Sequence, residues 1–594
     1  MPRARQGGEG RALAIGLQAV HDGAATPPGL LRQQGNTSVF ARTAFFHREP
    51  TVTRVAVPVG ANGLRIGYLV ETWSEQGNQL HHTLVGGDGA VLGIEARTAS
   101  DSYYVFAKSP ESGPQQTVSG PTSTTASPNG WLSNGAQATT NIGGNNVQAY
   151  LDTDANNAPD GGGTTVPDGD FGAAWDANTQ PGTTSNRAAA TQNLFYLNNV
   201  THDRLYGYGF TETAGNFQQD NFARGGSQGD RVLAEVQDGS GTDNANFATP
   251  SDGSSPRMQM YIWKGLGNAE VKVGDITYKA QLGSFSAPLS VTGINGTLIL
   301  ANDGTGTTSD ACERFPRNVS LAGRIVIADR GTCDFTVKAS NVQRAGGIGL
   351  IVANNTEGAI FAMGGSGTSQ IPAVMVTSTD GSKLKASVNG PATMSATAAP
   401  PIDRDSSLDS DIVYHEYGHG LTWRMIGSMS GPMSGAIGEG MSDVLALLFN
   451  NDNDRVGEYS ASDPLGIRTQ PYQNYTRTYK DFGGTEVHLD GEIYGAIGWR
   501  LRNNFSAAGL GVDTLLDYLV DGMNETEPGP AIEDMRDGIL QAIRNAGETL
   551  DGPQQCRVWE AFAHYGVGVG AQATVSRRNK LTITESKTVP ASCQ

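Results

Sequence analysis

The sequence predicts an α+β fold spread over several domains. Residues 1 to about 115 alternate short β-rich runs with turn residues, whereas most helical patterns lie after residue 400. Residues 268–400 read instead as strand, helix and strand. A chain of 594 residues also exceeds what one hydrophobic core normally holds. We therefore expect a β- and loop-rich part, an α/β segment and a helical part, in that order.

The N-terminal part mixes strands with loops. Residues 64–70 pattern as a strand, and the apolar stretch 12–17 indicates a helix, since no signal-peptide cleavage site follows it. Residues 113–190 are rich in Ser, Thr, Asn and Gly, so we expect an exposed linker and long loops there. Residues 193–263 again show the patterning of a folded segment, with many Asn, Asp and Gly between aromatic residues.

The α/β segment and the helical part are easier to divide. Residues 324–328 predict a buried strand, residues 335–345 a helix, and residues 346–353 a glycine turn followed by a strand. Helices are then expected over roughly 406–425, from near Ile437, and over roughly 490–505, 512–523, 531–546 and 555–565.

Charge and hydropathy exclude some classes of protein. Asp and Glu number 59 against 41 Lys and Arg, a net charge of -18. An acidic surface argues against nucleic acid or an anionic membrane as a partner. No apolar run approaches the roughly 20 residues that a membrane span needs.

The four cysteines fall into two local groups. Three connectivities are possible, and sequence proximity favours the pairs Cys312–Cys333 and Cys556–Cys593. Two disulfides indicate an oxidising compartment. The alternative is four free thiols in a cytosolic protein.

The run HEYGH at residues 415–419 is the strongest sign of chemistry. On a helix, His415 and His419 lie one turn apart on the same face and can bind one metal ion. This is the HExxH pattern of zinc hydrolases, in which Glu416 is the general base. The alternative is two unrelated histidines on a helix surface.

A catalytic zinc needs a third protein ligand and one open position. Glu439 is the best candidate, at the expected start of the next helix, and Asp443 lies four residues on along the same face. Asp443 is suited to accept the free ring N–H of a ligating histidine. The alternative is an ordinary acidic first helical turn, which the helix dipole favours.

Hydrolysis also needs a donor to the tetrahedral oxyanion. His488 precedes an expected helix and is a candidate, although a lone histidine is more often structural. Tyr472, Tyr475 and Tyr479 are possible phenolic donors, and the sequence does not choose among them.

Several segments in order resemble the fungalysin family of secreted zinc metallopeptidases, which are distant relatives of the thermolysin type. They are NLFYLNN at 193–199, HD at 202–203, YGF at 208–210, NF at 216–217, DRVLAE at 230–235, NANF at 244–247, PRMQMY at 256–261, HEYGHG at 415–420, GEGMSD at 438–443 and VHLDG at 487–491. The resemblance covers most of residues 120–265 and 401–565.

The resemblance implies a site and a two-lobed thermolysin-like fold. His415, His419 and Glu439 become the zinc ligands, Glu416 the base, Asp443 their support, and His488 a residue that binds the oxyanion or substrate. Asn244 and Ala245 match an edge strand that pairs with the substrate backbone. One catalytic zinc ion is expected, and calcium is a possible second metal that the sequence itself does not indicate.

The resemblance also divides the chain. Residues 1–115 are similar to the end of the family's pro-segment, an inhibitor removed by self-cleavage, and 116–267 and 401–594 to the two parts of the catalytic domain. The intervening residues 268–400 resemble an inserted protease-associated (PA) domain, in DRGTCDF at 329–335, AGGIG at 345–349 and IPAV at 371–374.

These expectations describe a secreted zinc endopeptidase, made as a latent precursor and monomeric, that acts on proteins or peptides. One alternative is a zinc aminopeptidase, which needs a pocket for the free amine and usually two metals. The other is a catalytically silent zinc-binding or adhesive protein, which has no need of Glu416.

Overall fold

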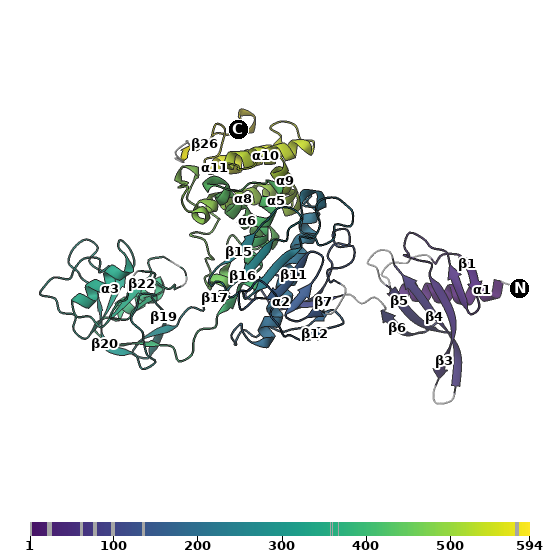
Figure 1. Cartoon of the computed structure of the whole chain (residues 1–594), viewed down its shortest axis with the longest axis horizontal. Coiled ribbons are helices and arrows are strands. Elements are labelled where there is room, and N and C mark those ends of the chain that lie inside the picture. Colours follow the sequence, from purple (N-terminus) through teal and green to yellow (C-terminus); the bar gives the residue numbers. More distant parts are fainter. Residues whose placement is uncertain are drawn as a thin grey trace. The chain divides into compact units, whose positions relative to one another are not determined.

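The computed structural model describes residues 3–594 except 21–26, 60–62, 75–79, 97–100, 134–136, 357, 359, 366 and 576–580. The chain divides into two compact units, Met1–Asp101 and Ser102–Gln594 (Figure 1). The division precedes the expected boundary at residue 115, because β7 (Ser102–Val105) and β8 (Gln116–Ser119) form a sheet with β13 (Asp170–Phe171) of the second unit.

The first unit is an antiparallel sheet with one helix. The sheet consists of β1 (Leu30–Gln34), β2 (Thr37–Phe40), β3 (Thr51–Val59), β4 (Gly63–Trp73), β5 (Leu80–Gly86) and β6 (Val91–Ala96), paired in sequence order. The helix expected around residues 12–17 is part of α1 (Arg3–Val20). Leu13 and Leu17 of this helix are buried in one core with Val52, Val70 and Val85 of the sheet. This unit therefore has a core of its own.

The second unit begins with a seven-stranded sheet. Its order is β12 (Thr165–Val166), β9 (Gln137–Ala138), β10 (Asn141–Gly143), β11 (Val147–Leu151), β14 (Val232–Val236), β16 (Arg257–Met260) and β15 (Ala245–Ala248). The linker expected over residues 113–190 is thus wrong, because that segment supplies several of these strands. Among the described strands, β15 is the edge of this sheet and pairs with β16 alone.

Helix α2 (Thr184–Tyr206) lies against β11 and was not expected (Figure 1). It is buried on almost every side, so its sequence shows no apolar stripe. Part of the buried surface of this helix consists of amide side chains in place of apolar ones. Asn193, for example, accepts the backbone N–H of Phe106 at 2.7 Å and donates to the carbonyl of Ser407 at 3.2 Å.

Strand β14 buries a carboxyl group, Glu235, whose side chain is inaccessible to solvent. Tyr150 donates to its Oε1, and its Oε2 has no hydrogen-bond partner. Burial, together with Asp238, raises the pKa of Glu235 to about 8 from an ordinary value of 4.5. Between these values the folded chain keeps a proton that the unfolded chain loses, so this group costs stability as the pH rises from about 4.5 to 8.

Replacing Glu235 by Gln keeps the shape and removes the charge. We expect the variant and the parent to have the same unfolding temperature at pH 5. At pH 8 the variant should unfold several degrees higher, because each kcal/mol of stability raises the unfolding temperature by about 2–4 °C. Thermal unfolding at the two pH values measures the difference. A gap of the same size at both would show that Glu235 does not titrate in this window.

Residues 269–396 form a closed seven-stranded barrel. Around it run β18 (Ala269–Val273), β19 (Ile276–Leu282), β23 (Ala373–Val376), β22 (Gly349–Ala353), β21 (Arg324–Asp329), β20 (Ile294–Leu300) and β24 (Pro391–Ala396), with helices α3 (Phe335–Arg344) and α4 (Ser378–Ala386) outside. The strand, helix and strand predicted within residues 324–353 are confirmed by β21, α3 and β22.

The segments that precede and follow the barrel lie next to each other. The short strand β17 (Ile262–Trp263) precedes the barrel, and β25 (Arg404–Asp405) follows it. The two pair antiparallel, Ile262 with Asp405 and Trp263 with Arg404. The two ends of the barrel segment are therefore joined by this short ladder.

The C-terminal part is helical, as predicted. It contains α5 (Ser410–Met425), α6 (Pro432–Asn450), α7 (Glu458–Ala461), α8 (Val487–Ala507), α9 (Val512–Asn524), α10 (Ile532–Asn545) and α11 (Pro553–His564), and a hairpin of β26 (Gln572–Val575) and β27 (Leu581–Thr584). Helix α6 starts earlier than the expected Ile437, because Pro432 takes its first turn after the left-handed Gly431. No helix among the described residues is long and apolar enough to cross a bilayer.

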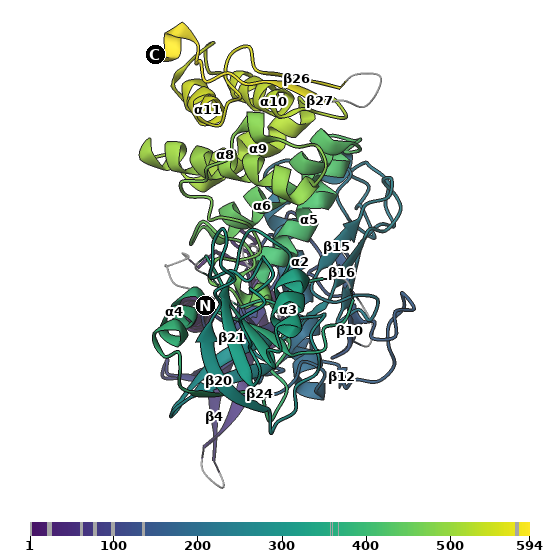
Figure 2. The same ribbon diagram turned by 90° about the vertical axis from the view of Figure 1, so that its left-hand side faces the viewer.

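Close packing of α5 on α6 brings the two sides of the predicted site together (Figure 2). A Cβ at Gly418 would lie 2.7 Å from the Cα of Ser442. A side chain at Gly440 would likewise meet the carbonyl of Gly491 on α8 at 2.4 Å. Glycine at these positions lets the three helices approach closely enough for their side chains to share one site.

Candidate metal centre

Helix α5 carries the HEYGH run, buried in the helical part. Its N-cap, Asp409, accepts the backbone N–H of Asp411, which fixes where the helix begins. The rings of His415 and His419 meet edge to face, with their centroids 4.9 Å apart. The helix thus presents both imidazoles on one face, as the spacing predicts.

Helix α6 supplies the third group. Nε2 of His415 is 3.3 Å from Oε2 of Glu439, and Nε2 of His419 is 3.7 Å from Oε1 of the same carboxylate. One ligand atom from each of the three residues lies within 4.8 Å of the others. Glu439 lies in the interior of α6 and not in its first turn. The alternative that the helix dipole favours an acidic residue at this position therefore does not apply.

The site has the properties that a zinc ion requires. Oε2 of Glu439 and Oε2 of Glu416 are both buried without a hydrogen-bond partner. Two imidazole nitrogens and a carboxylate oxygen are a common catalytic zinc ligand set. Buried polar atoms without partners are costly, and a cation in their midst removes that cost. The residues present therefore fit zinc.

Asp443 supports the first histidine. Its Oδ1 lies 2.7 Å from Nδ1 of His415, which leaves Nε2 of that ring directed at the ligand cluster. Arg468 donates to both carboxylate oxygens of Asp443, at 2.7 and 2.8 Å. The Arg468 guanidinium and His415 together outweigh burial and hold the pKa of Asp443 well below its usual range, so it is ionised.

Sequence reasoning missed Arg468. It lies outside the helices, in the irregular segment between α7 and α8, and belongs to no motif. The three tyrosines suggested as oxyanion donors instead hydrogen-bond to carboxylates. Tyr472 donates to Asp443, Tyr475 to Glu492 and Tyr479 to Glu533. All three rings are buried and none lines the cavity described below.

His488 is the second residue of α8. The N-cap Glu486 accepts the backbone N–H groups of His488 and Leu489 and lies 2.7 Å from Nδ1 of the His488 ring. Nε2 of His488 is 3.6 Å from Oε1 of Glu439. The ring is 56% exposed, so it projects into open space beside the ligand cluster.

A cavity of about 450 Å³ opens over these groups. Asn244 and Ala245 line one wall with Phe247, and the unpaired edge of β15 therefore borders the cavity. The other lining residues are Asn246, Trp263, Ile412, His415, Glu416, His419, Trp423, Glu439, Ile467, Arg468 and His488. Burial raises the pKa of Glu416 to about 7, which suits a general base near neutral pH. The predicted zinc ligands thus line the cavity together with Glu416, His488, Asn244 and Ala245, whereas Asp443 and the three candidate tyrosines do not.

Comparison with known proteins identifies the family. Residues 101–571 match the family described as fungalysin metallopeptidase (M36). The chain belongs to this family. The match confirms the resemblance stated above, the metallopeptidase class and the dependence of such an enzyme on zinc.

Curated fungalysin relatives are similar at moderate identity. Extracellular metalloproteinase MEP of Pyricularia oryzae is 27% identical over 91% of this chain and 69% of its own length. Extracellular metalloproteinase mep of Aspergillus flavus is 26% identical over 82% and 61%. Extracellular metalloproteinase 10 of Coccidioides posadasii is 26% identical over 94% and 72%. The chain thus spans about three fifths to seven tenths of these relatives, whose names agree with the expected extracellular location.

Solved structures give weaker likenesses. The precursor of protealysin from Serratia proteamaculans is 21% identical, with a TM-score of 0.22 over 28% of this chain and 59% of that one. The aminopeptidase from Aneurinibacillus sp. strain AM-1 is 23% identical, with a TM-score of 0.18 over 27% and 34%. These TM-scores are too low to compare the folds.

Proposed function

We propose that this fungalysin is a secreted zinc endopeptidase whose ion is held by His415, His419 and Glu439. One observation carries the proposal. Three convergent ligand atoms and the buried Oε2 of Glu416, which has no hydrogen-bond partner, belong to residues that line a cavity bordered by a free strand edge. A purely structural zinc site closes all four positions with protein ligands and has no use for such a base.

The chemistry is divided between the ion and the chain. When bound, zinc supplies Lewis-acid activation of water and of the peptide carbonyl. Glu416 accepts the proton of the attacking water and passes it to the leaving amine. His488, oriented by Glu486, lines the same cavity and donates to the oxyanion. Asp443 and Arg468 keep the His415 ring in one orientation.

The substrate is an extended peptide. The edge strand β15 has unpaired backbone groups on the side away from β16, and a peptide that adds to it gains backbone hydrogen bonds. Asn244 and Ala245 lie where that strand begins, on the cavity wall. A peptide bound along this edge as an extended chain supports cleavage within the chain, and thus an endopeptidase rather than an aminopeptidase.

The remaining parts receive roles from the sequence resemblance. We assign the barrel to a protease-associated domain and the first unit to the end of a pro-segment that keeps the enzyme latent as an intramolecular inhibitor. The closed barrel with its own core supports the first assignment, and the separate core of the first unit supports the second. We further propose that the enzyme acts as a monomer.

Metal removal tests the proposed function. Once the first unit has been removed by self-cleavage, we expect the enzyme to cleave an internally quenched peptide, to lose more than nine tenths of this activity on dialysis against a chelator, and to regain it with one equivalent of zinc. A peptide blocked at its N-terminus should be cleaved equally well. Activity that survives complete zinc removal would contradict the metal mechanism, and cleavage only of peptides with a free N-terminus would favour the aminopeptidase.

A further inference from the structure

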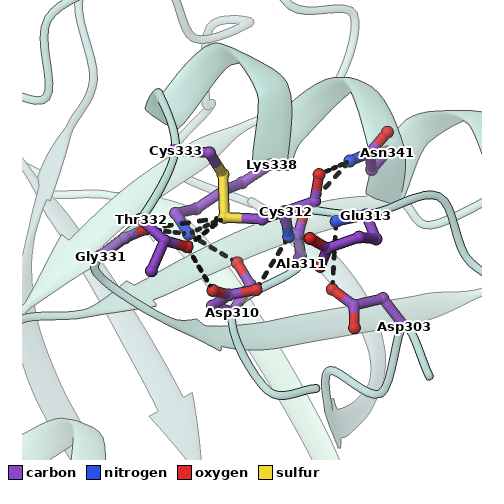
Figure 3. The surroundings of a disulfide bond; sticks show 10 residues. All are labelled: Asp303, Asp310, Ala311, Cys312, Glu313, Gly331, Thr332, Cys333, Lys338 and Asn341. Atoms are coloured by element: carbon purple, nitrogen blue, oxygen red, sulfur yellow. Dashed lines mark hydrogen bonds between the residues drawn. A yellow bond between two sulfur atoms is a disulfide. The ribbon is translucent and has the colours of Figure 1, made fainter. Parts of the chain in front are cut away.

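Three carboxylates gather at one end of the barrel, outside the metal centre. Asp303, Asp310 and Glu313 lie in the connection between β20 and β21, beside the disulfide Cys312–Cys333 (Figure 3). One carboxylate oxygen from each lies within 4.8 Å of the others. Asp303 and Asp310 are both 2% exposed, whereas Glu313 is open to solvent.

The negative charge of this cluster is not balanced by an ion pair. No lysine, arginine or histidine of the described residues forms a salt bridge with any of the three carboxylates. The buried ammonium of Lys338 interacts electrostatically with all three carboxylates, but its hydrogen bonds go to the carbonyls of Asp310 at 2.7 Å and Gly331 at 2.9 Å and to Sγ of Cys312. Desolvation and the charges of Asp303 and Asp310 raise the pKa of Glu313.

One carboxylate oxygen of Asp303 is buried without a hydrogen-bond partner from the protein. Its Oδ2 accepts the backbone N–H of Glu313 at 3.3 Å, whereas its Oδ1 is buried with no hydrogen-bond partner. A buried carboxylate oxygen without a donor is costly, and repulsion from two neighbouring carboxylates adds to the cost. A bound cation removes both costs.

The loop that carries these residues is held in place by other contacts. Asn341 of α3 donates to the carbonyls of Ala311 at 3.1 Å and Cys312 at 2.9 Å. Thr332 donates to Oδ2 of Asp310 at 2.6 Å, and Oδ1 of Asp310 accepts the N–H of Cys312. The side chains therefore meet because helix α3 and the disulfide fix the backbone, which leaves the carboxylates arranged before any ion binds.

We propose that Asp303, Asp310 and Glu313 bind one Ca²⁺ ion. All-oxygen sites built from carboxylates suit hard cations, and calcium tolerates the irregular geometry of a loop better than magnesium does. Exposure of Glu313 leaves one side of the site open to water ligands. The ion ties the loop before β21 to the disulfide-linked segment at residues 331–333, and thereby stabilises this end of the barrel. This inference is independent of the proposed peptidase mechanism.

Calcium titration of the full chain tests the proposal. The protein carries Glu416→Gln to prevent self-cleavage and is freed of metal with a chelator before Ca²⁺ is added. We expect slower hydrogen exchange in peptides covering residues 301–313, and calorimetric binding that is at least tenfold weaker in Glu313→Gln. The substituted side chain is exposed, so this variant should fold like the parent. Asp303→Asn should show the same loss, with folding checked by circular dichroism.

A second acidic group provides the matched control. Asp152, Asp154 and Asp160 also lie close together, and Asp154→Asn should leave the calcium response of residues 301–313 unchanged. Unchanged exchange of this loop on adding Ca²⁺, or equal Ca²⁺ affinity in the parent and in Glu313→Gln, would overturn the proposal. An equal response to Mg²⁺ would overturn the assignment to calcium.

Discussion

Glu416→Gln should lower kcat by about 10³-fold or more, because general acid–base groups contribute up to about 10⁴-fold and no other carboxylate of the cavity is free to replace it. Glu439 is occupied with the two histidines. The variant should still bind one equivalent of zinc, since the three ligand atoms are untouched. Peptide cleavage and zinc content measured on the same sample separate the two effects.

The structure also predicts the stability of this variant. Oε2 of Glu416 has no hydrogen-bond partner, and burial raises the pKa of the carboxyl to about 7. The substitution removes a buried charge above pH 7, so at pH 8 the unfolding temperature should be equal to or above that of the parent. Glu525→Gln makes the same chemical change at an exposed carboxylate outside the cavity and should retain full activity. Wild-type turnover in Glu416→Gln would exclude this residue as the base.

Asp443→Asn should weaken both zinc binding and folding. The substitution leaves Nδ1 of His415 without its carboxylate and removes the nearer of the two acidic partners of the buried Arg468, the other being Glu439 at 3.6 Å. Loss of such a support typically costs about 10–100-fold in metal affinity. Breaking a buried ion pair on one side costs about 3–5 kcal/mol in the free energy of unfolding.

Competition with a zinc chelator of known affinity and denaturant unfolding measure these two losses. The matched control is Asp513→Asn, a carboxylate whose side chain is 78% exposed, which should change neither quantity. If zinc affinity in Asp443→Asn equals that of the parent, then Asp443 does not hold the His415 ring in the metal-binding orientation.

The sequence predicts most of the ligand cluster because helical periodicity specifies it. His415 and His419 share a face by spacing alone, and Glu439 and Asp443 do so on the next helix. The two disulfides, Cys312–Cys333 and Cys556–Cys593, also followed from sequence proximity and are both present. Family resemblance added Asn244 and Ala245, which no periodic pattern indicates.

Other features could not be predicted because they depend on long-range packing. Arg468 acquires its partners only when an irregular segment folds back over α6. Helix α2 is hidden because a helix enclosed on every side has no polar face to mark its period. The strands within residues 113–190 are two to five residues long, too short for an alternating pattern to emerge from a Gly- and Thr-rich background.

The ladder between β17 and β25 has a consequence for biosynthesis. The strands up to Trp263 leave the ribosome before the barrel, whereas the helices that complete their core follow Arg404. A barrel that folds first brings its own two ends together, which shortens the effective loop that must close before Ile262 finds Asp405. We therefore expect the order of domain folding during synthesis to determine how long the N-terminal half of the peptidase remains exposed to aggregation.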